Sequence, residues 1–346
     1  MTHTQPIPST MRALVAPSAG SPLELRELPV PRPRHGEVLV RMAAAPLNPS
    51  DLLMLSGEYG RSWAFPFVPG LEGSGRVVAS GGGLLGRLVL GKAVAVAADE
   101  SGLWAEWVTV PANRCVALPR DAALGAGAMS FVNPLTAIAL VQEARRARHT
   151  SAISVAAGGA LGRMIRARAA TEGLEIINVV RRESQAAELR AEGARHVLAT
   201  EAADFDARLA ELCRQLGCRL AFDPVAGDTT RRLADALEPG GEVVLYGALS
   251  GQPLVLNPDA VLYKQITVRS FWLSRWLEGR SLFQMIRLTG QVTKALQGGF
   301  AESRVTRILP LERATEAPAL YASAMSAGKV LIQIGTEPLG LEPHVG

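Results

Sequence analysis

The stretch that most constrains the fold is residues 153–183, where a short apolar run, a glycine turn, a helix-forming segment and a second apolar run follow one another. This order predicts a strand at residues 153–156, a helix rich in Ala and Arg, and a second strand at residues 176–180. Small residues in the turn let the backbone approach a pyrophosphate, and the N–H groups at the helix start favour negative charge. The stretch therefore predicts an anion site, built from Gly158, Gly159, Ala160, Leu161 and Gly162.

The glycine spacing supports a dinucleotide site only together with its context. The turn reads AxxGxxG, with Ala156, Gly159 and Gly162, and not the full GxGxxG pattern. However, the glycines follow a predicted strand and open a predicted helix, and a second strand ends about 20 residues later, as a dinucleotide-binding unit requires. The context therefore predicts a dinucleotide-binding fold.

Two arginines stand where the second predicted strand ends. An NAD site usually carries Asp or Glu at this place for the ribose hydroxyls, whereas this chain has Arg181 and Arg182. Guanidinium groups bind a 2′-phosphate through paired, charge-assisted hydrogen bonds. The pair therefore favours NADPH over NADH as the cofactor. In the alternative interpretation, Arg181 and Arg182 begin a solvent-exposed helix face.

Length and composition set broad limits. The 346 residues suggest about two domains, and 48% hydrophobic with 20% charged residues is ordinary for a soluble globular protein. The net charge of +4 is small and its basic residues are spread out, so we expect no nucleic-acid partner. Residues 1–10 lack a signal-peptide core, and no apolar run is long enough to span a membrane. The odd number of cysteines, without a CxxC pair, favours a reducing cytoplasmic location.

Residues 11–118 have the pattern of short strands. Apolar runs bounded by Gly or Pro occur at residues 23–28, 38–42, 75–79, 93–97 and 107–110. They predict a compact β-rich domain. The glycine-rich segment at residues 80–92 is predicted to be a turn between strands, because no amphipathic helix follows it.

From Pro119 onwards, helical and strand patterns alternate. Helical spacing occurs at residues 122–129 and 135–148, and strand candidates recur at residues 153–156, 176–180, 196–199, 220–223, 242–246 and 266–271. This alternation predicts an α/β fold with a mostly parallel, doubly wound sheet. Beyond Leu277 we expect a helix, a strand at residues 305–309, a helix at residues 311–325 and a closing strand at residues 329–334.

Several motifs together resemble the medium-chain dehydrogenase/reductase superfamily over residues 11–334. They are PLNPSDLLMLSGEYG at residues 46–60 followed by PGLEGSGRVV, FVNPLTA at 131–137, GEVVLYG at 241–247, FWLSRW at 271–276 and GKV at 328–330. Within the superfamily, NPSD followed by GEYG, VNPLTA and FWLSRW look most like the zinc-independent 2-enoyl thioester reductases. The pair Gly158 and Gly159 is more like that of quinone oxidoreductases.

The resemblance implies a division of the chain and an assembly. It implies a Rossmann domain with a doubly wound parallel sheet at residues 124–276, and a β-rich GroES-like catalytic domain formed by residues 1–123 and 277–346. It also implies a homodimer in which the last sheet strands pair near residues 266–271.

The residues do not support a zinc site. Zinc alcohol dehydrogenases of this superfamily place a Cys near the position of Asn48 and a His at that of Leu71, because Zn²⁺ needs soft or nitrogen ligands. Glu72 alone cannot hold the metal, and the five histidines show no ligand spacing. We therefore expect no metal.

Without a metal to polarise a carbonyl, a conjugated alkene is a suitable hydride acceptor. Hydride adds at its β-carbon, and an acid must then protonate the α-carbon. The resemblance implies that Tyr59, in the NPSD…Y stretch, is this acid, since a tyrosine keeps its proton at neutral pH. Alternatively, Tyr59 is a loop aromatic packed by Trp63 and Phe65.

The resemblance assigns further cofactor contacts. It implies that Asn133 contacts the nicotinamide or ribose, that Tyr246 and Gly247 line the cofactor, and that a lysine, Lys329, reaches it; the segment over the nicotinamide would be Phe271, Trp272 and Leu273. Three of these residues have a structural alternative. Asn133 could be a helix N-cap, Trp272 could be a core or dimer-interface aromatic, and Lys329 could be exposed.

Three functions remain open. The first is NADPH-dependent, metal-free reduction of the C=C bond of α,β-unsaturated acyl thioesters carried by coenzyme A or acyl carrier protein. The second is reduction of quinones or small enones on the same fold. The third is a non-catalytic NADPH-binding protein. An acidic carrier could bind arginines 145, 146 and 148 or arginines 163, 166 and 168, although a solvated helix face explains both clusters as well.

Overall fold

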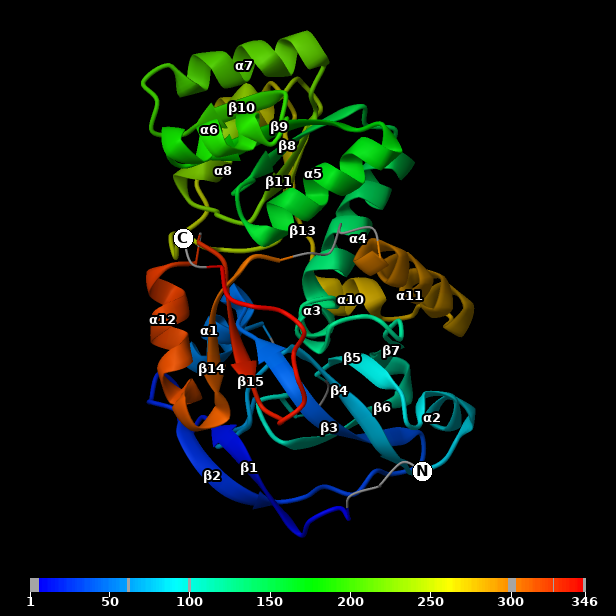
Figure 1. The fold of residues 1–346 in the computed structure, drawn as a ribbon. Helices are drawn as coiled ribbons and strands as arrows, with labels where there is room; N and C mark the ends of the chain where they lie inside the picture. The colour runs from blue at the N-terminus through cyan, green and yellow to red at the C-terminus, as the bar shows by residue number, and fades with distance from the viewer. Residues whose placement is uncertain (1–5, 61–62, 99–100, 298–302, 326, 345–346) are drawn as a thin grey trace. The chain divides into compact units, whose positions relative to one another are not determined.

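The computed structural model describes residues 6–60, 63–98, 101–297, 303–325 and 327–344 (Figure 1). It separates into two compact units. The first unit comprises Met1–Asn133 and Ser281–Gly346, and the second unit is Pro134–Arg280. The first boundary therefore falls inside helix α4 (Val132–Arg146), whereas the sequence interpretation sets it at residue 124, ahead of the preceding helix α3 (Leu124–Ala128).

The second unit contains a six-stranded parallel sheet with the order β10-β9-β8-β11-β12-β13. The strands are β8 (Ser151–Val155), β9 (Glu175–Val180), β10 (His196–Ala199), β11 (Leu220–Asp223), β12 (Glu242–Leu245) and β13 (Thr267–Ser270). Every residue of β8 is buried, because parallel strands are covered on both faces and are therefore apolar throughout. The strand order reverses between β8 and β11, which is the place where doubly wound sheets bind ligands.

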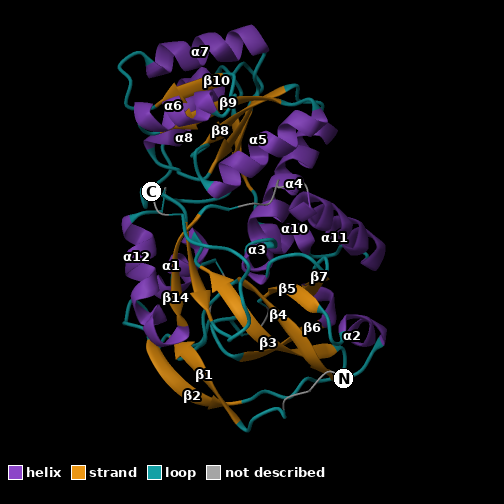
Figure 2. Ribbon diagram, viewed as in Figure 1, coloured by secondary structure: helices purple, strands orange, loops and turns teal. Residues whose placement is uncertain are grey.

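A helix follows each of these strands in the sequence, and the helices are drawn in purple in Figure 2. They are α5 (Ala160–Glu172), α6 (Glu183–Ala191), α7 (Phe205–Leu216), α8 (Asp228–Ala236), α9 (Pro258–Leu262) and α10 (Leu273–Leu277). In α7 the buried residues Phe205, Leu209 and Cys213 recur every fourth position, so one stripe of the helix faces the core. The predicted α/β class and parallel sheet are thus confirmed.

The first unit contains a seven-stranded sheet, ordered β14-β15-β3-β4-β5-β7 with β6 paired to β3, and a separate hairpin of β1 and β2. The strands are β1 (Thr10–Val15), β2 (Glu24–Pro29), β3 (Glu37–Pro46), β4 (Glu72–Ser80), β5 (Ala93–Ala97), β6 (Trp107–Pro111), β7 (Cys115–Ala117), β14 (Val305–Pro310) and β15 (Lys329–Gln333). The closing strand β15 pairs with β3, so the two ends of the chain share one sheet.

The first unit contains further helices besides α3. They are α1 (Pro49–Ser56), α2 (Leu84–Val89), α11 (Leu282–Gln297), α12 (Ala317–Ser323) and the 3₁₀ helices η1 (Ala112–Arg114) and η2 (Leu311–Glu316). Among the described residues, no helix combines the length and the apolar character needed to cross a bilayer.

Two local predictions were wrong. The glycine-rich segment 80–92 is not only a turn, since Leu and Arg are strong helix formers and α2 forms there despite its buried Gly86. The helix expected at residues 311–325 is divided into η2 and α12. The cause is Pro318, which lacks an N–H group and is tolerated only in the first turn of a helix, so a new helix begins at Ala317.

Candidate functional site

The turn between β8 and α5 has the backbone that a dinucleotide site requires. Ala156 is left-handed, with φ of 54°. A Cβ added at Gly162 would lie 2.5 Å from the Cα of Ala157, so only glycine lets α5 pack this closely on the turn. A Cβ at Gly158 would make only an ordinary 3.6 Å contact with Val180. Of these glycines, Gly162 is therefore needed for packing, whereas Gly158 keeps the approach to the backbone open.

The start of α5 suits an anion. Gly159 is its N-cap, and among the described residues no side chain caps the helix. Ala160 and Leu161 supply N–H groups of its first turn. These N–H groups and the helix dipole fit the pyrophosphate of the predicted dinucleotide.

Arg181 and Arg182 follow β9, and both side chains are exposed. Arg182 is the N-cap of α6, and its N–H donates to Oε1 of Gln185 at 3.1 Å. Arg181 lies outside the helix, with its Nε 3.6 Å from a carboxylate oxygen of Glu201. Arg182 therefore caps a helix that begins at Glu183, while Arg181 precedes it, and both side chains are exposed at the strand end where a ribose phosphate would bind.

The carboxyl ends of β11 and β12 carry a buried carboxylate that the sequence interpretation missed. Asp223 accepts hydrogen bonds from the N–H groups of Val225 and Ala226 at 2.8 and 3.1 Å, and from the Thr230 hydroxyl at 2.6 Å. Burial, together with the charge of Asp223, raises the pKa of Tyr246, so its phenol stays neutral. The signal in the sequence is an Asp that ends an apolar run and precedes Pro224.

Gly247 and the segment after β13 are held by the backbone. A Cβ at Gly247 would lie 2.7 Å from the carbonyl oxygen of Pro224, so the two loops approach closely. Phe271 donates its N–H to Leu245 at 2.8 Å and is buried, while Trp272 is the N-cap of α10 and Leu273 begins that helix. These residues stand at the same edge of the sheet as the β8 turn, as parallel strands require.

In the first unit, Tyr59 follows α1. Asn48 is the N-cap of this helix, and Gly57 ends it in the left-handed conformation with φ of 79°. The N–H of Tyr59 donates to the carbonyl of Leu53 at 3.0 Å, which fixes its backbone against the last turn of the helix. Trp63 and Phe65 both pack on Phe67, with ring centroids 5.6 and 4.9 Å apart. Tyr59 itself is half-buried.

A buried polar cluster lies beside α1, and we call Asn48, Asp51, Glu72 and Lys329 the charge cluster. None of the four side chains is more than 4% exposed. Asp51 accepts from the N–H of Asn48 at 2.7 Å and from the N–H of Leu71 at 3.0 Å. The Asn48 amide donates to Oε1 of Glu72 at 3.0 Å.

The remaining bonds join the charge cluster to distant parts of the chain. Glu72 accepts from the N–H groups of Val132 at 2.8 Å and Phe131 at 3.2 Å. Lys329 donates from Nζ to the carbonyl of Leu47 at 3.2 Å and to Oδ1 of Asn48. The alternative that Lys329 is exposed was wrong, because its side chain is only 4% exposed.

The charge cluster contains two carboxylates but one ammonium group. Burial raises the pKa of Asp51 to about 7, although the N–H of Asn48 opposes this shift. Burial likewise raises the pKa of Glu72, which Lys329 opposes, and lowers the pKa of Lys329, which Glu72 opposes. The cluster can therefore hold an extra proton near neutral pH.

Asn133 lies in the first turn of α4 and is 8% exposed. The helix already begins at Val132, so the alternative that Asn133 is its N-cap was wrong. In the part of the chain that the structure describes, no group of three or more His, Cys, Asp or Glu residues could hold a metal ion.

Comparisons with known proteins agree with this architecture. Residues 160–289 match the model of the zinc-binding dehydrogenase family, and residues 34–120 match the alcohol dehydrogenase GroES-like domain. The mitochondrial enoyl-[acyl-carrier-protein] reductase of Bos taurus is 32% identical over 313 residues, which is 88% of this chain and 84% of that protein.

Two solved structures of similar proteins have the same fold as this chain. A candidate NADPH:quinone reductase from Mesorhizobium loti has a TM-score of 0.85 at 30% identity and covers 95% of this chain and 100% of its own. The quinone oxidoreductase from Thermus thermophilus, also solved with NADPH, has a TM-score of 0.76 at 27% identity over 94% of this chain and 100% of its own. This chain belongs to the medium-chain dehydrogenase/reductase superfamily.

Proposed function

We propose that this protein, an NADPH-dependent oxidoreductase, reduces the C=C bond of α,β-unsaturated acyl thioesters. The observation that carries the proposal is the likeness to enoyl-[acyl-carrier-protein] reductases, at 32% identity over 84% of the Bos taurus protein. The NPSD…Tyr59 stretch on and after α1 supports it, because it supplies a phenol where the thioester reductases use one.

The cofactor would bind to the second unit. The first-turn N–H groups of α5 would hold the pyrophosphate, and Gly162 lets the helix approach closely enough to do so. Arg181 and Arg182 would bind the 2′-phosphate through charge-assisted hydrogen bonds. Tyr246, Gly247, Phe271, Trp272 and Leu273 would line the nicotinamide end. The contact that the resemblance implies for Asn133 stays a prediction. When bound, NADPH supplies a hydride.

Tyr59 would provide the proton. Its backbone is fixed by the bond to Leu53, and its phenol is protonated at neutral pH, so it can donate that proton to the α-carbon or stabilise an enolate oxygen. For Lys329 we propose a structural role in place of the cofactor contact that the resemblance implies. Its Nζ is bonded to Leu47 and Asn48, so it would hold the start of α1, and with it the Tyr59 segment, in place.

A quinone or small-enone reductase is the second candidate. The similarity to the Mesorhizobium loti and Thermus thermophilus proteins, at 30% and 27% identity, favours it, as does the Gly158-Gly159 pair. A quinone reductase would not depend on Tyr59, because water can protonate quinone oxygens.

The test is NADPH oxidation, followed by absorbance, with a short trans-2-enoyl-CoA and with a simple quinone, for the wild type and Tyr59→Phe. We expect turnover of the thioester that falls at least ~10²-fold in the variant, the low end for a lost general acid. The second candidate would be favoured if the quinone is reduced at the same rate by both proteins and the thioester is not reduced by either. NADPH binding without turnover of either acceptor would favour a non-catalytic role.

The identity of the acyl carrier has one structural clue. Arg163 and Arg166 both pair with Glu192, and Arg168 pairs with Glu172. Arg163 also pairs with Glu188, so three carboxylates oppose the three arginine charges of α5, which supports a solvated helix face there. Arg145 donates to the carbonyl of His149 at 2.8 Å, at the end of α4. If an acidic carrier docks on either cluster, the end of α4 is the better candidate.

The protein would act as a homodimer. Strand β13 is at the edge of its sheet, and the helix before it carries apolar side chains that are unusually exposed: Val261 43%, Leu262 66% and Tyr263 79%. Pairing of β13 with its copy would satisfy the strand edge and cover these side chains. A cytoplasmic location stays a prediction, since the Bos taurus relative is mitochondrial.

A further inference from the structure

A carboxylate stands beside the arginine to which the phosphate contact is assigned. Oε1 of Glu201 lies 3.6 Å from Nε of Arg181, and the two side chains are 60% and 68% exposed. Such an exposed pair contributes little to stability. Its effect on an anion that approaches Arg181 is larger, because the carboxylate carries the same sign of charge as a phosphate.

The backbone holds Glu201 in this place. The segment after β10 is bonded to the segment after β9: Thr200 donates its N–H to Val180 at 2.9 Å, and Glu201 donates its N–H to Arg181 at 3.2 Å. The Thr200 hydroxyl also donates to the carbonyl of Arg181, at 3.5 Å. The two strand ends are thus fixed together, and the neighbouring position of their side chains follows from that.

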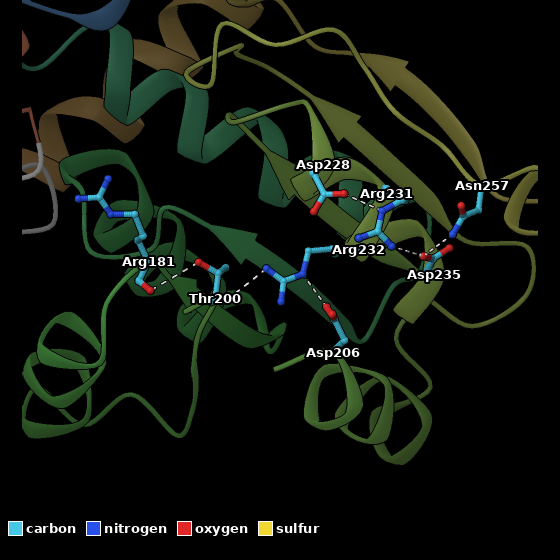
Figure 3. A network of polar contacts seen from close by, with 8 residues as sticks. All are labelled: Arg181, Thr200, Asp206, Asp228, Arg231, Arg232, Asp235 and Asn257. Atoms are coloured by element: carbon cyan, nitrogen blue, oxygen red, sulfur yellow. Dashed lines mark hydrogen bonds and ion pairs between the residues drawn. The ribbon is translucent and has the colours of Figure 1, made fainter. Parts of the chain in front are cut away.

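Arg232 of α8 also contacts Thr200, as Figure 3 shows. Arg232 of α8 donates from Nη1 to the Thr200 carbonyl at 3.2 Å and from Nε to Asp206 of α7 at 2.6 Å. Its guanidinium group lies 4.2 Å from the centre of the Phe205 ring. Two helices therefore hold the loop that carries Glu201.

We propose that Glu201 is a specificity-determining residue that opposes binding of the 2′-phosphate at Arg181 and so limits the preference for NADPH over NADH. The carboxylate and the phosphate compete for one guanidinium group, and the two anions repel each other. The proposal rests on the cofactor role proposed for Arg181, but it does not depend on the acceptor substrate.

The test measures cofactor binding directly, by calorimetric titration of the full-length protein with NADPH and with NADH at low salt. In Glu201→Gln we expect NADPH to bind about 3- to 10-fold more tightly, the effect of removing one unit charge a few ångströms from the phosphate in water. NADH should bind no more tightly than to the wild type. The gain should shrink as salt is raised, because both groups are exposed.

The matched control is Glu211→Gln, which removes a similarly exposed carboxylate from an ion pair with Arg214 on α7. It should leave both affinities unchanged. In an Arg181→Gln background, Glu201→Gln should keep only part of its effect, because the competition for the guanidinium group has gone while the repulsion between the carboxylate and the phosphate remains.

Two results would overturn the inference in different ways. If Arg181→Gln weakens NADPH binding but Glu201→Gln leaves it unchanged or weakens it, Glu201 does not oppose the phosphate, while the cofactor assignment stands. If Arg181→Gln has no effect on NADPH binding, the role of Arg181 fails, and the role of Glu201 fails with it.

Discussion

Lys329 and Asn48 are 281 positions apart in the sequence, yet the ammonium group of one donates a buried hydrogen bond to the side-chain oxygen of the other. The contact joins β15 to the start of α1, so the charge cluster is built from residues near both ends of the chain. The energetic importance of the cluster follows from burial, since its side chains are at most 4% exposed and water can solvate their charges little.

Lys329→Met should destabilise the protein strongly. The substitution keeps most of the side-chain volume but removes the buried charge that opposes the raised pKa values of Asp51 and Glu72. Loss of an opposing charge from a buried site costs about 3–5 kcal/mol. The free energy of unfolding in urea measures the effect. Lys92→Met, at an exposed position of the same unit, is the control and should change stability little. Equal stability of the two variants would show that the ammonium group contributes nothing net.

The pH dependence of stability should change in Asp51→Asn. The pKa of Asp51 rises from 3.8 in its reference state to about 7 in the folded chain. The folded state therefore binds this proton more tightly, so the contribution to stability is complete below about pH 4 and is lost as the pH rises to about 7. The pKa of Glu72 is raised too and acts in the same direction.

Urea unfolding at pH 5 and at pH 8 separates the Asp51 contribution from the rest. The wild type should lose more stability between these two values than Asp51→Asn does, because the amide cannot ionise. Asp121→Asn, at an exposed position, should keep the wild-type dependence. The same loss in all three proteins would contradict the assignment to Asp51.

Gly162→Ala and Gly158→Ala should behave differently. The added Cβ would lie 2.5 Å from the Ala157 Cα in the first variant and 3.6 Å from Val180 in the second. We expect Gly162→Ala to lose about 1–3 kcal/mol of stability through overpacking, and to bind NADPH more weakly because the start of α5 must move. Gly158→Ala should fold as the wild type does. Thermal unfolding and NADPH titration check both, and a Gly162→Ala protein that is as stable as Gly158→Ala would refute the packing argument.

The elements that can be predicted from the sequence are those whose signal is local. The buried strands β8 and β9 show as apolar runs, and the β8 turn shows as small residues between a strand and a helix. The parallel order follows because strands alternate with helices. The resemblance of the motifs adds Tyr59 to the candidate site. Hydrophobic periodicity could not have predicted this residue, which is half-buried and follows α1.

The charge cluster and the Glu201 contact could not be predicted in this way. Asp51 and Glu72 look like ordinary charged residues in the sequence, and only the pairing of β15 with β3 brings Lys329 to them. Glu201 lies beside Arg181 because of the register of β10 against β9, which the sequence does not reveal. Both depend on tertiary contacts between segments that are distant in the sequence, and the composition of one segment gives no information about its contact with the other.

The late position of Lys329 also affects how the chain is made. A ribosome that adds about 5–20 residues per second reaches Lys329 roughly 10–50 s after Glu72, since roughly 250 residues lie between them. During that interval the second unit, which is continuous in sequence, can complete its sheet. Until β15 has been made, Asp51 and Glu72 lack the Lys329 ammonium group, and β3 lacks the strand that pairs with it at residues 44–46.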